Sequence, residues 1–508
     1  MTMLAFTSAY SQCLAMFPSK HVMLFAVTAF EFGSGVCGAA PNMIALILGR
    51  AIAGFGGSGI IASCIIILSE MTTLKQRAIY MGFIGISLTI APALGPFAGG
   101  VLSDDISWRW CFYINLPIGG FGFALLFALV ETRHPYGMAQ TYQGYGMHML
   151  RQLVRCDLMG VAIALLWGVV SVLGLQWGGV TKSWNHWSVV VCFLMSDALA
   201  VIFVAWEAFM GNNAMLPLKL FQSRTVRGAG ILSMFGWASF IIAVYYFSLG
   251  FQAVYKWVFF LRPKIHAEFR FRSMSALEAG IHLLPLIMVE MLAVTLAGRL
   301  IFHVNLYFVI LLGPVFITAG YGLLYFITPN HPIARLMGGE VLVGIGVGMF
   351  LQNIIIVTQW EFRHQPHLVT PATGSIILMG NIGRLIGVST AGSVFENMLQ
   401  VNIHKYAPDV PQSLIMAAMN AADALWRIVP PPYQAVVLQA YVKTLEDVFL
   451  VGIFMGGLGF VVALLMPKSR MNLRDERRPQ TQDVEKRSGE RIIVGSSEAA
   501  VQTMEAGA

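Results

Sequence analysis

Four ionisable side chains stand inside long apolar stretches of this 508-residue chain. Arg50 lies in the stretch LGRAIAGFGGSG, and three acidic residues, Glu31, Asp197 and Glu290, lie deep in other apolar segments. A charge at the centre of a membrane-spanning helix costs on the order of 3 kcal/mol by insertion scales, so each group must face a polar interior or a partner. Buried carboxyl groups are natural proton carriers. The pattern predicts proton coupling by these four residues, with a structural role as the alternative.

Glycine and proline recur on nearly one face of GISLTIAPALGPFAGG. Small residues let two helix backbones approach closely, and spanning helices tolerate Pro because neighbouring helices satisfy the freed backbone groups. Gly85, Gly95, Pro96, Gly99 and Gly100 are therefore predicted to form a closely packed hinge between helices. Ordinary helix packing is the alternative.

A binding surface is predicted from polar and aromatic residues at mid-span. The segment VLVGIGVGMFLQNIIIVTQ places Gln352 and Asn353 one turn after a run of glycines. Trp237 and Tyr245 add aromatic surface suited to a lipophilic ligand. The alternatives are small-residue packing for the glycines and interface or core packing for the aromatic side chains.

Sequence patterns of an enzyme are absent. The chain has no metal-ligand cluster, no nucleotide-binding loop with a Walker lysine and no nucleophile–base arrangement. We therefore predict no catalytic residues, no metal and no cofactor, and the pattern argues against ATP-driven transport. The net charge of +7 is attributed to basic residues at cytoplasmic helix ends rather than to nucleic acid binding.

The elements that carry these residues are predicted to be membrane-spanning helices. Only 11% of residues are charged and 57% are hydrophobic, whereas a soluble domain has about 25% charged residues. A spanning helix needs roughly 20 mainly apolar residues. Thirteen segments qualify: Met3 to Phe17 (short), His21 to Ala40, Met43 to Leu68, Ile79 to Leu102, Cys111 to Val130, Leu158 to Gly178, Ser188 to Met210, Gly228 to Ala253, Gly280 to Phe302, Leu306 to Ile327, Val341 to Thr358, Thr373 to Leu399 and Val448 to Pro467.

These segments fall into an all-α arrangement of successive units. We expect an N-terminal bundle at 1–130, a cytoplasmic connector at 131–157, two linker spans at 158–210, and a C-terminal bundle at 228–467 with an insert near 256–273 and an extracellular loop at 404–444. The tail 468–508 mixes charges with few apolar residues, which predicts disorder. The face that carries Lys20 and the tail holds more Lys and Arg than the other, which predicts that it is cytoplasmic.

Two adjacent motifs give the chain a resemblance to a known family. LGRAIAGFGGSG, with Arg50 and Gly54, resembles the fourth-span motif of major facilitator superfamily transporters, and the stretch ending at Gly100 resembles the fifth-span motif of proton-driven drug antiporters. With SWRWCFYINLPIGG and LQWGG, these motifs are similar to the fourteen-span fungal drug:proton antiporters, efflux pumps of the toxin or multidrug type. The resemblance implies two six-helix bundles, coupling through Arg50, and conformational change at Gly54 and the fifth-span glycines.

Two departures from the family pattern are expected. The first of the fourteen spans, which carries an acidic residue in relatives, has no counterpart, so about thirteen spans are expected. The residues WVFFLRPKIHAEFRFR stand between Lys256 and Ser273, where relatives pass almost directly to the next span. We expect a sequence shortened at its N-terminus and an insert that is a retained intron or a lineage-specific loop.

The expected function is export of small lipophilic compounds, such as drugs, toxins or secondary metabolites, by proton antiport. The partners would be the substrate, protons and the lipid bilayer, with no nucleic acid, and the protein would act as a monomer in the plasma membrane with its tail in the cytoplasm. One alternative is a proton-coupled transporter of siderophores, amino acids or other nutrients. Alternatives from another class are a non-transporting membrane sensor and an inactive gene product.

Overall fold

The computed structural model describes residues 2–72, isolated positions between 76 and 102, and residues 106–132, 157–179, 181–211, 214, 216–250, 283–301, 303–326, 333–406, 408 and 431–468. Several sequence predictions lie outside these described residues: Gly85, Pro96 and Gly100, the insert near 256–273, most of the connector 131–157, and the tail after Lys468.

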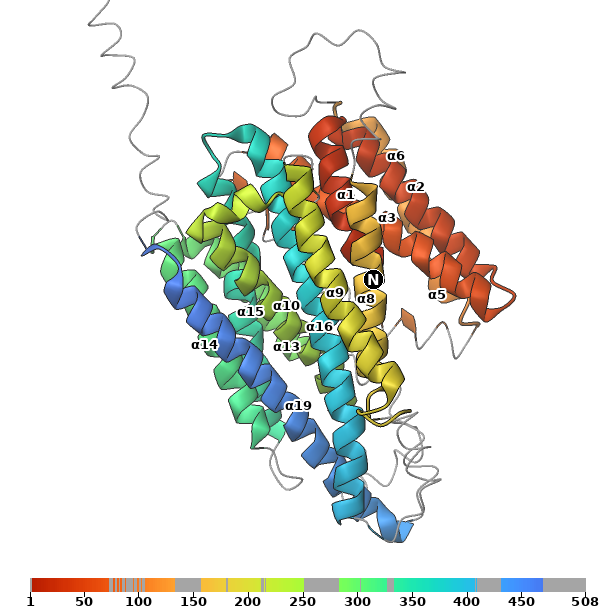
Figure 1. The fold of residues 1–508 in the computed structure, drawn as a ribbon. Helices are drawn as coiled ribbons and strands as arrows, with labels where there is room; N and C mark the ends of the chain where they lie inside the picture. Colours follow the sequence, from red (N-terminus) through yellow and green to blue (C-terminus); the bar gives the residue numbers. More distant parts are fainter. Residues whose placement is uncertain are drawn as a thin grey trace, which may run out of the picture.

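Figure 1 shows the helices along the chain. The first are α1 (Thr2–Met16), α2 (Ser19–Gly38), α3 (Met43–Met71), the short α5 (Trp110–Tyr113) and α6 (Asn115–Leu129). They are followed by α8 (Leu158–Trp177), α9 (Trp187–Met210), the 3-10 helix η2 (Leu218–Gln222), α10 (Arg224–Gly250), α13 (Leu284–Leu300), α14 (Leu306–Tyr325), α15 (Ile333–Glu361), α16 (Pro366–Tyr406) and α19 (Pro431–Leu465).

Ten helices in the described ranges are long and apolar enough to cross a membrane. They correspond to ten of the thirteen predicted spans. The count of thirteen is not confirmed, because α1 has 15 residues and α13 has 17, and the segment Ile79 to Leu102 lies largely outside the described residues. The all-helical prediction holds for the described helices.

Three helices are longer than the apolar spans predicted for them. α15 begins at Ile333, α16 begins at Pro366 and ends at Tyr406, and α19 begins at Pro431. The loop expected at 404–444 is therefore shorter, since its last part belongs to α19. Hydropathy marks only the apolar part of a helix, whereas the backbone hydrogen bonds continue through polar residues with good helix propensity.

Local sequence signals set the starts of several helices. The side chains of Asn42 and Asp157 accept hydrogen bonds from the backbone nitrogens of Ala45 and Gly160 at the first turns of α3 and α8. Asn305 makes the equivalent contact at α14. Each cap satisfies an amide group that the helix leaves unpaired at its start.

Glycines of α3 bring this helix close to α2 and α1. A Cβ atom added to Gly56 would overlap the backbone nitrogen of Phe30 in α2 and lie 2.7 Å from the carbonyl oxygen of Ala26. One added to Gly59 would collide with the ring of Tyr10 in α1. Helix association in lipid depends on such close approach. Part of the glycine run in the fourth-span motif therefore serves packing.

Glycines also hold α15 between two neighbours. A Cβ atom added to Gly344 would lie 2.6 Å from the carbonyl oxygen of Leu286 in α13, and one added to Gly348 would lie 2.6 Å from that of Glu290. On the opposite side of α15, Gly346 meets the backbone of α14. The predicted small-residue segment thus packs on two faces.

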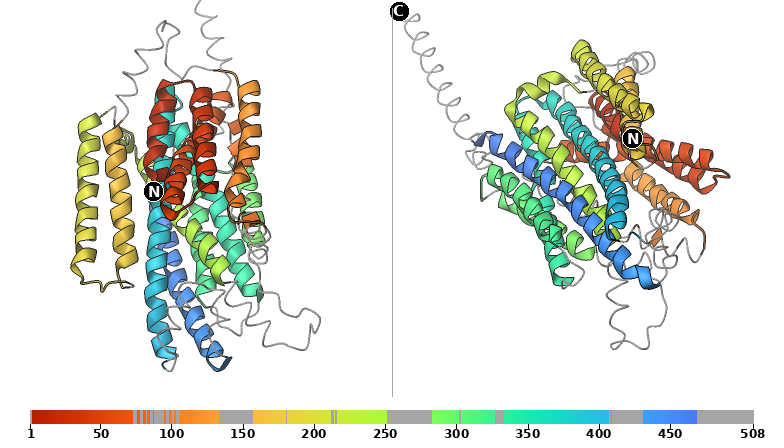
Figure 2. Two further views of the ribbon diagram at one scale, coloured as in Figure 1. Left: turned by 90° about the vertical axis from the view of Figure 1, so that its right-hand side faces the viewer. Right: turned by 60° about the horizontal axis from the view of Figure 1, so that its bottom comes forward.

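Contacts divide the described helices into three sets. α1, α2, α3, α5 and α6 pack on one another, α10 and α13 to α19 form a second set, and α8 pairs with α9. Figure 2 shows the α8–α9 pair as a hairpin beside the two larger sets. We call the larger sets the N-terminal half and the C-terminal half.

The helix α8 covers the line along which the two halves meet. Val161 and Ala164 of α8 pack with Ala5 of α1 and Leu378 of α16 in one apolar cluster. Contacts of α1 with α16 run alongside. A single helix of the hairpin therefore touches both halves at once.

Hydrogen bonds fasten the hairpin near both of its ends. The backbone nitrogen of Asp157, just before α8, donates to the side chain of Gln12 in α1 at 3.1 Å. At the other end of α8, Asn397 of α16 donates to the carbonyl oxygen of Gly178 at 3.1 Å. The next residue, Gly179, has φ of 79°, a conformation that favours glycine.

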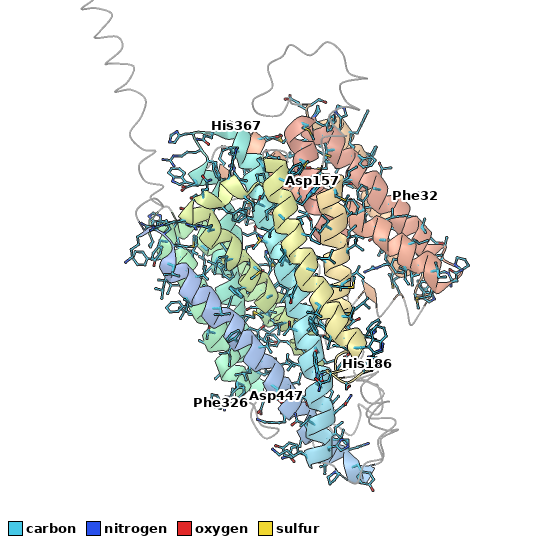
Figure 3. The ribbon with its side chains drawn as sticks, in the orientation of Figure 1. Phe32, Asp157, His186, Phe326, His367 and Asp447 are labelled. Carbon is cyan, nitrogen blue, oxygen red and sulfur yellow. The ribbon has the colours of Figure 1, made fainter. Side chains whose placement is uncertain are left out.

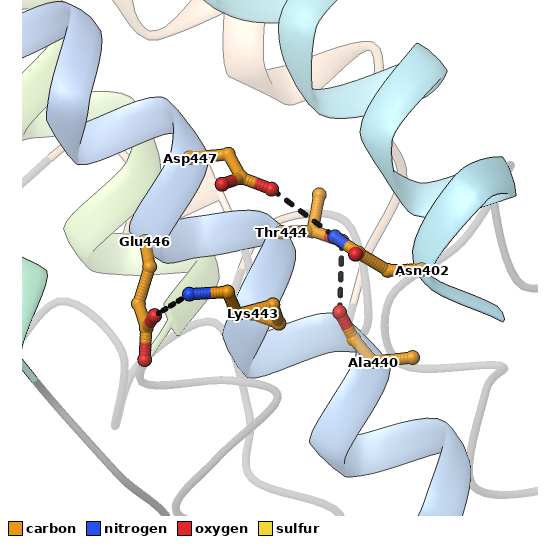
Figure 4. A network of polar contacts seen from close by, with 6 residues as sticks. All are labelled: Asn402, Ala440, Lys443, Thr444, Glu446 and Asp447. Atoms are coloured by element: carbon orange, nitrogen blue, oxygen red, sulfur yellow. Dashed lines mark hydrogen bonds and ion pairs between the residues drawn. The ribbon is translucent and has the colours of Figure 1, made fainter. Parts of the chain in front are cut away.

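A polar network joins α16 to α19 (Figure 4). Asn402 donates to Thr444 Oγ1 at 3.1 Å and to Asp447 Oδ2 at 3.2 Å. Within α19, Lys443 Nζ donates to Glu446 Oε2 at 2.6 Å. Because hydrocarbon offers no hydrogen bonds, such contacts satisfy polar groups internally. They also fix the register between the two helices.

The substitution Gly56→Leu should destabilise the N-terminal half, because its side chain would displace the backbone of α2. Overpacking of this kind costs roughly 1 to 3 kcal/mol. Gly57→Leu is a matched control, since a Cβ atom at Gly57 would meet only the ring of Phe30, at 3.9 Å. Thermal unfolding of the detergent-purified protein measures the difference. Equal midpoints for the two variants would contradict the packing argument.

Candidate functional site

The labelled side chains in Figure 3 mark two ends of the helix bundle. Asp157 and His367 lie at one end, and His186, Phe326 and Asp447 lie toward the other. We call these the Asp157 end and the Asp447 end. α16 begins at the first, and α15 runs in the opposite direction.

A cation stacks on an aromatic ring at mid-depth in the C-terminal half. Arg384 lies near the middle of the 41-residue helix α16. Its guanidinium carbon is 3.5 Å from the centroid of the Trp237 ring in α10. Gly380, one turn earlier, leaves room for the indole, because a Cβ atom there would collide with it. A desolvated cation–π contact of this kind contributes about 2 kcal/mol.

An amide connects this cation to the N-terminal half. Arg384 Nη1 donates to Asn381 Oδ1 at 3.0 Å. Asn381 Nδ2 in turn donates to Thr7 Oγ1 in α1 at 2.9 Å. The carbonyl oxygen of Asn381 thus accepts a hydrogen bond within the C-terminal half, and its amide nitrogen donates one to the N-terminal half.

A second polar connection lies nearer the Asp157 end. Arg77 Nη1, from the segment after α3, donates to Gln359 Oε1 of α15 at 2.9 Å. Gln359 Nε2 donates to Thr373 Oγ1 of α16 at 3.2 Å. Arg77 Nη2 also donates to the carbonyl oxygens of Ser69 and Thr72. Gln359 therefore links the end of α3 to two helices of the other half.

Spacing along α15 and α16 identifies the faces that look toward this junction. Thr373 and Arg384 are about three helical turns apart, and Gln352 and Gln359 about two turns apart, so each pair shares a face. Since Thr373 and Gln359 contact each other, the faces of α16 and α15 that carry Arg384 and Gln352 are turned toward each other. We call Arg384, Trp237, Asn381, Gln352 and Thr7 the central cluster.

The described hydrogen bonds between the halves lie at the central cluster and on one side of it. Among the described residues, the hydrogen bonds between the halves lie at the cluster or toward the Asp157 end. Toward the Asp447 end, α2, α3 and α5 turn away from α16 and α19 (Figure 1). Met43, Ile44 and Ile47 of α3 are exposed there. Among the described residues, the hydrogen-bonded junction between the halves therefore lies at the cluster and on its Asp157 side.

The predicted coupling residue Arg50 lies on the part of α3 that turns away. It is exposed, and its guanidinium carbon is 5.9 Å from the centroid of the Phe112 ring. Gly54, one turn later, packs against Thr2 of α1. Neither residue belongs to the central cluster. The role of Arg50 in coupling stays a prediction.

The three predicted acidic residues lie at three separate places. Glu31 is half-buried, with its carboxylate against Gly119 of α6. Glu290 is 6% exposed and lies where α13 packs on α15. Asp197 is exposed on α9, in the hairpin. None of the three is in the central cluster.

Some of the predicted cavity residues belong to the central cluster, whereas the others and the described hinge glycines lie outside it. Gln352 and Trp237 belong to the central cluster, whereas Asn353 donates to Met349 O of its own helix. Tyr245 is 62% exposed and lies about two turns from Trp237 toward the Asp447 end. For the predicted hinge glycines 95 and 99, no described atom lies within 4 Å of an added Cβ atom.

Two ionisable residues inside helices were missed by the sequence predictions. Arg384 stands in NIGRLIGV, and the argument that singled out Arg50 would have found it. Glu340 is 0% exposed in α15, and neither carboxylate oxygen has a hydrogen-bond partner among the described residues. It precedes the predicted span from Val341 by one residue, so hydropathy left it outside.

Comparison with known families identifies the fold. Residues 3–388 match the profile of the Major Facilitator Superfamily. The chain belongs to this superfamily. The match runs from α1 past Arg384 and therefore includes the central cluster. Because the superfamily consists of membrane transporters, the prediction that the chain is not an enzyme is confirmed.

Fungal superfamily members resemble the chain over most of its length. The MFS-type efflux pump elcC of Phaeosphaeria nodorum is 30% identical, over 90% of this chain and 78% of the relative. The MFS-type efflux pump MFS1 of Trichophyton rubrum is 31% identical, over 91% and 81%. The efflux pump aflT of Aspergillus parasiticus is 30% identical, over 91% and 85%. The resemblance predicted from the sequence motifs is confirmed.

Solved structures of the superfamily share the fold at low identity. The human organic anion transporter MFSD10 (TETRAN) aligns with a TM-score of 0.50 at 14% identity, over 90% of this chain and 81% of that one. A proton dependent oligopeptide transporter aligns with a TM-score of 0.51 at 11% identity, over 92% and 89%. At such identities the likeness concerns the fold alone.

The substitution Gln359→Leu should loosen the junction at the Asp157 end, because Arg77 and Thr373 lose their shared partner. A single reporter cysteine at Thr7, in a variant without the native cysteines, should then react faster with N-ethylmaleimide, since the buried site opens more often. Mass spectrometry of the labelled protein gives the rate.

Gln352→Leu is the control for this experiment. It changes a glutamine two turns away on the same face of α15, whereas the hydrogen bond from Arg77 goes to Gln359, so the labelling rate should stay near that of the reporter alone. A Gln359→Leu rate no higher than that of the control would show that the hydrogen bond does not hold the halves together.

Proposed function

We propose that the chain is a secondary active exporter that moves a small lipophilic compound out of the cell in exchange for protons. The observation that carries the proposal is the central cluster, where a cation and an aromatic ring lie at mid-depth in one half, and the amide bonded to the cation contacts the other half. In secondary transporters the substrate site lies near the bilayer midplane between two halves, and their rocking exposes it to each side in turn.

Basic residues support a cytoplasmic location for the Asp157 end. Lys20, Arg224, Arg299 and Arg363 lie at helix ends on this side. Cytoplasmic loops carry the excess of Lys and Arg in membrane proteins. In this orientation the halves touch on the cytoplasmic side and diverge outside, as expected for an outward-facing state. The tail after Lys468 then begins in the cytoplasm.

The relatives support the direction of transport. Three fungal relatives that align along most of their length are described as efflux pumps. Because one chain contains both halves, a single copy suffices for alternating access, and we propose that it acts as a monomer in the plasma membrane. The resemblance to fungal drug pumps supports this location.

We assign proton coupling first to Glu340. An ionised carboxylate without a partner in a closed apolar site is very costly, so this side chain carries its proton in the present conformation. If rocking of the halves opens the site, the proton can leave. Glu290 and Glu31 are further proposed carriers, and Arg50 is proposed to act with them. Asp197 is not favoured, because it is exposed on the hairpin.

Export can be tested in a yeast strain that lacks its own drug pumps. Cells that express the chain and are preloaded with a panel of lipophilic fluorescent compounds should lose at least one compound faster than cells with an empty vector. A protonophore should abolish the difference, because it removes the gradient that drives export. Retention equal to the vector control for every compound would count against the proposal.

Glu340→Gln should uncouple transport from the proton gradient, because the amide mimics the protonated acid and cannot release a proton. In proteoliposomes, uptake driven by an imposed pH gradient should fall to the level of downhill exchange, while that exchange persists. Asp197→Asn is the matched control and should keep the response of the wild type. A normal gradient response in Glu340→Gln would move the assignment to Glu290 or Glu31.

A further inference from the structure

We infer that the central cluster takes its compound as a lipophilic organic anion, an inference that rests on the proposed function. The starting observation is that Arg384 is a cation at mid-depth with an aromatic neighbour and a neutral amide as its polar contact. The charge of this residue is the property that should select the compound.

Counter-charges are missing around Arg384 in the described residues. The helices that meet it or its amide partner, α1 and α10, contain no acidic residue, and neither does α8 beside them. On its own helix the nearest carboxylate belongs to Glu396, twelve residues away, which is about 18 Å at the rise of an α-helix. No ion pair to Arg384 occurs among the described residues, where Lys443 pairs with Glu446.

The register between α15 and α16 places the other acids of α15 far away as well. Gln359 contacts Thr373, so the level of Arg384 on the antiparallel α15 corresponds to about residue 348. Glu340 lies eight residues beyond that level and Glu361 thirteen residues before it, about 12 Å and about 20 Å along the helix. Glu290 of α13 meets α15 near this level, at Gly348. No described carboxylate of α1, α8, α10, α15 or α16, however, lies at the level of the cation.

The guanidinium of Arg384 has more N–H donors than hydrogen bonds to described protein atoms. A guanidinium group has five N–H donors in a rigid planar fork. One hydrogen bond to the protein, from Nη1 to Asn381, occurs in the described structure. A carboxylate or enolate would accept two parallel hydrogen bonds from the fork, which are shorter and stronger than bonds to a neutral acceptor.

The surroundings favour an apolar body behind that anionic group. Trp237 presents its ring beneath the guanidinium, and Phe240 stands edge-on to Trp237 with centroids 5.6 Å apart. Ile377, two turns before Arg384 on the same face, is partly buried and adds aliphatic surface. Arg384 itself is largely but not fully buried. An uncompensated cation beside apolar walls favours a hydrophobic acid and disfavours a hydrophobic amine.

Binding of three anthracenes that differ only in charge tests this inference. The probes are anthracene-9-carboxylate, its methyl ester and 9-(aminomethyl)anthracene, measured by equilibrium dialysis against the full chain purified in lipid nanodiscs at neutral pH. We expect the carboxylate to bind at least tenfold more tightly than the other two. In Arg384→Gln the three affinities should become similar, and Arg384→Lys should retain part of the preference because it keeps the charge but loses the fork.

The possible outcomes separate this inference from the proposed function. Equal affinities in the wild type, a preference for the amine, no binding of the carboxylate, or a carboxylate preference that survives in Arg384→Gln would each overturn it. Export of a neutral or cationic compound by yeast cells would then leave the export proposal standing. If Arg384→Gln does not fold, as judged by size-exclusion chromatography, the wild-type selectivity and the Arg384→Lys variant decide the matter.

Discussion

Lipid tails solvate an apolar side chain about as well as a neighbouring helix does, so the helices of this protein must associate by close contact and by internal polar contacts. The glycines of α3 and α15 provide the first kind of contact, with backbones so near that an added Cβ atom would strike the next helix. Each half is therefore held along whole helix lengths. The junction between the halves depends on far fewer groups, and movement should concentrate there.

The same constraint explains where the polar side chains lie. A hydrogen-bonding group that faces hydrocarbon stays unsatisfied, so such groups gather where helices converge. Asn381 is an example, because its carbonyl oxygen accepts a hydrogen bond from Arg384 and its amide nitrogen donates one to Thr7 of the other half. Loss of either partner would leave part of a buried amide unsatisfied, which couples the position of the cation to the contact between halves.

The sequence predicted the apolar cores of the spans, because hydropathy over about 20 residues is a local property. It also predicted Gln352 and Trp237 for a binding surface; Trp237 contacts Arg384, and the binding role of both residues stays a prediction. Helix ends were placed less well, since polar helix formers extend α15, α16 and α19 past their apolar parts. Glu340 was missed for this reason, as it stands in an extension. The pairing of Arg384 with Trp237 joins residues far apart in the chain, and no local pattern contains it.

The position of α8 affects how a hydrophobic molecule could travel sideways. Val161 and Ala164 lie against both α1 and α16, and hydrogen bonds hold the hairpin near each of its ends. A molecule dissolved in the leaflet at the Asp157 end therefore meets a helix where the two halves adjoin when it approaches the protein from this side. In that leaflet the hairpin therefore blocks direct entry between the halves from its own side, and a hydrophobic molecule would have to enter from a different side of the protein.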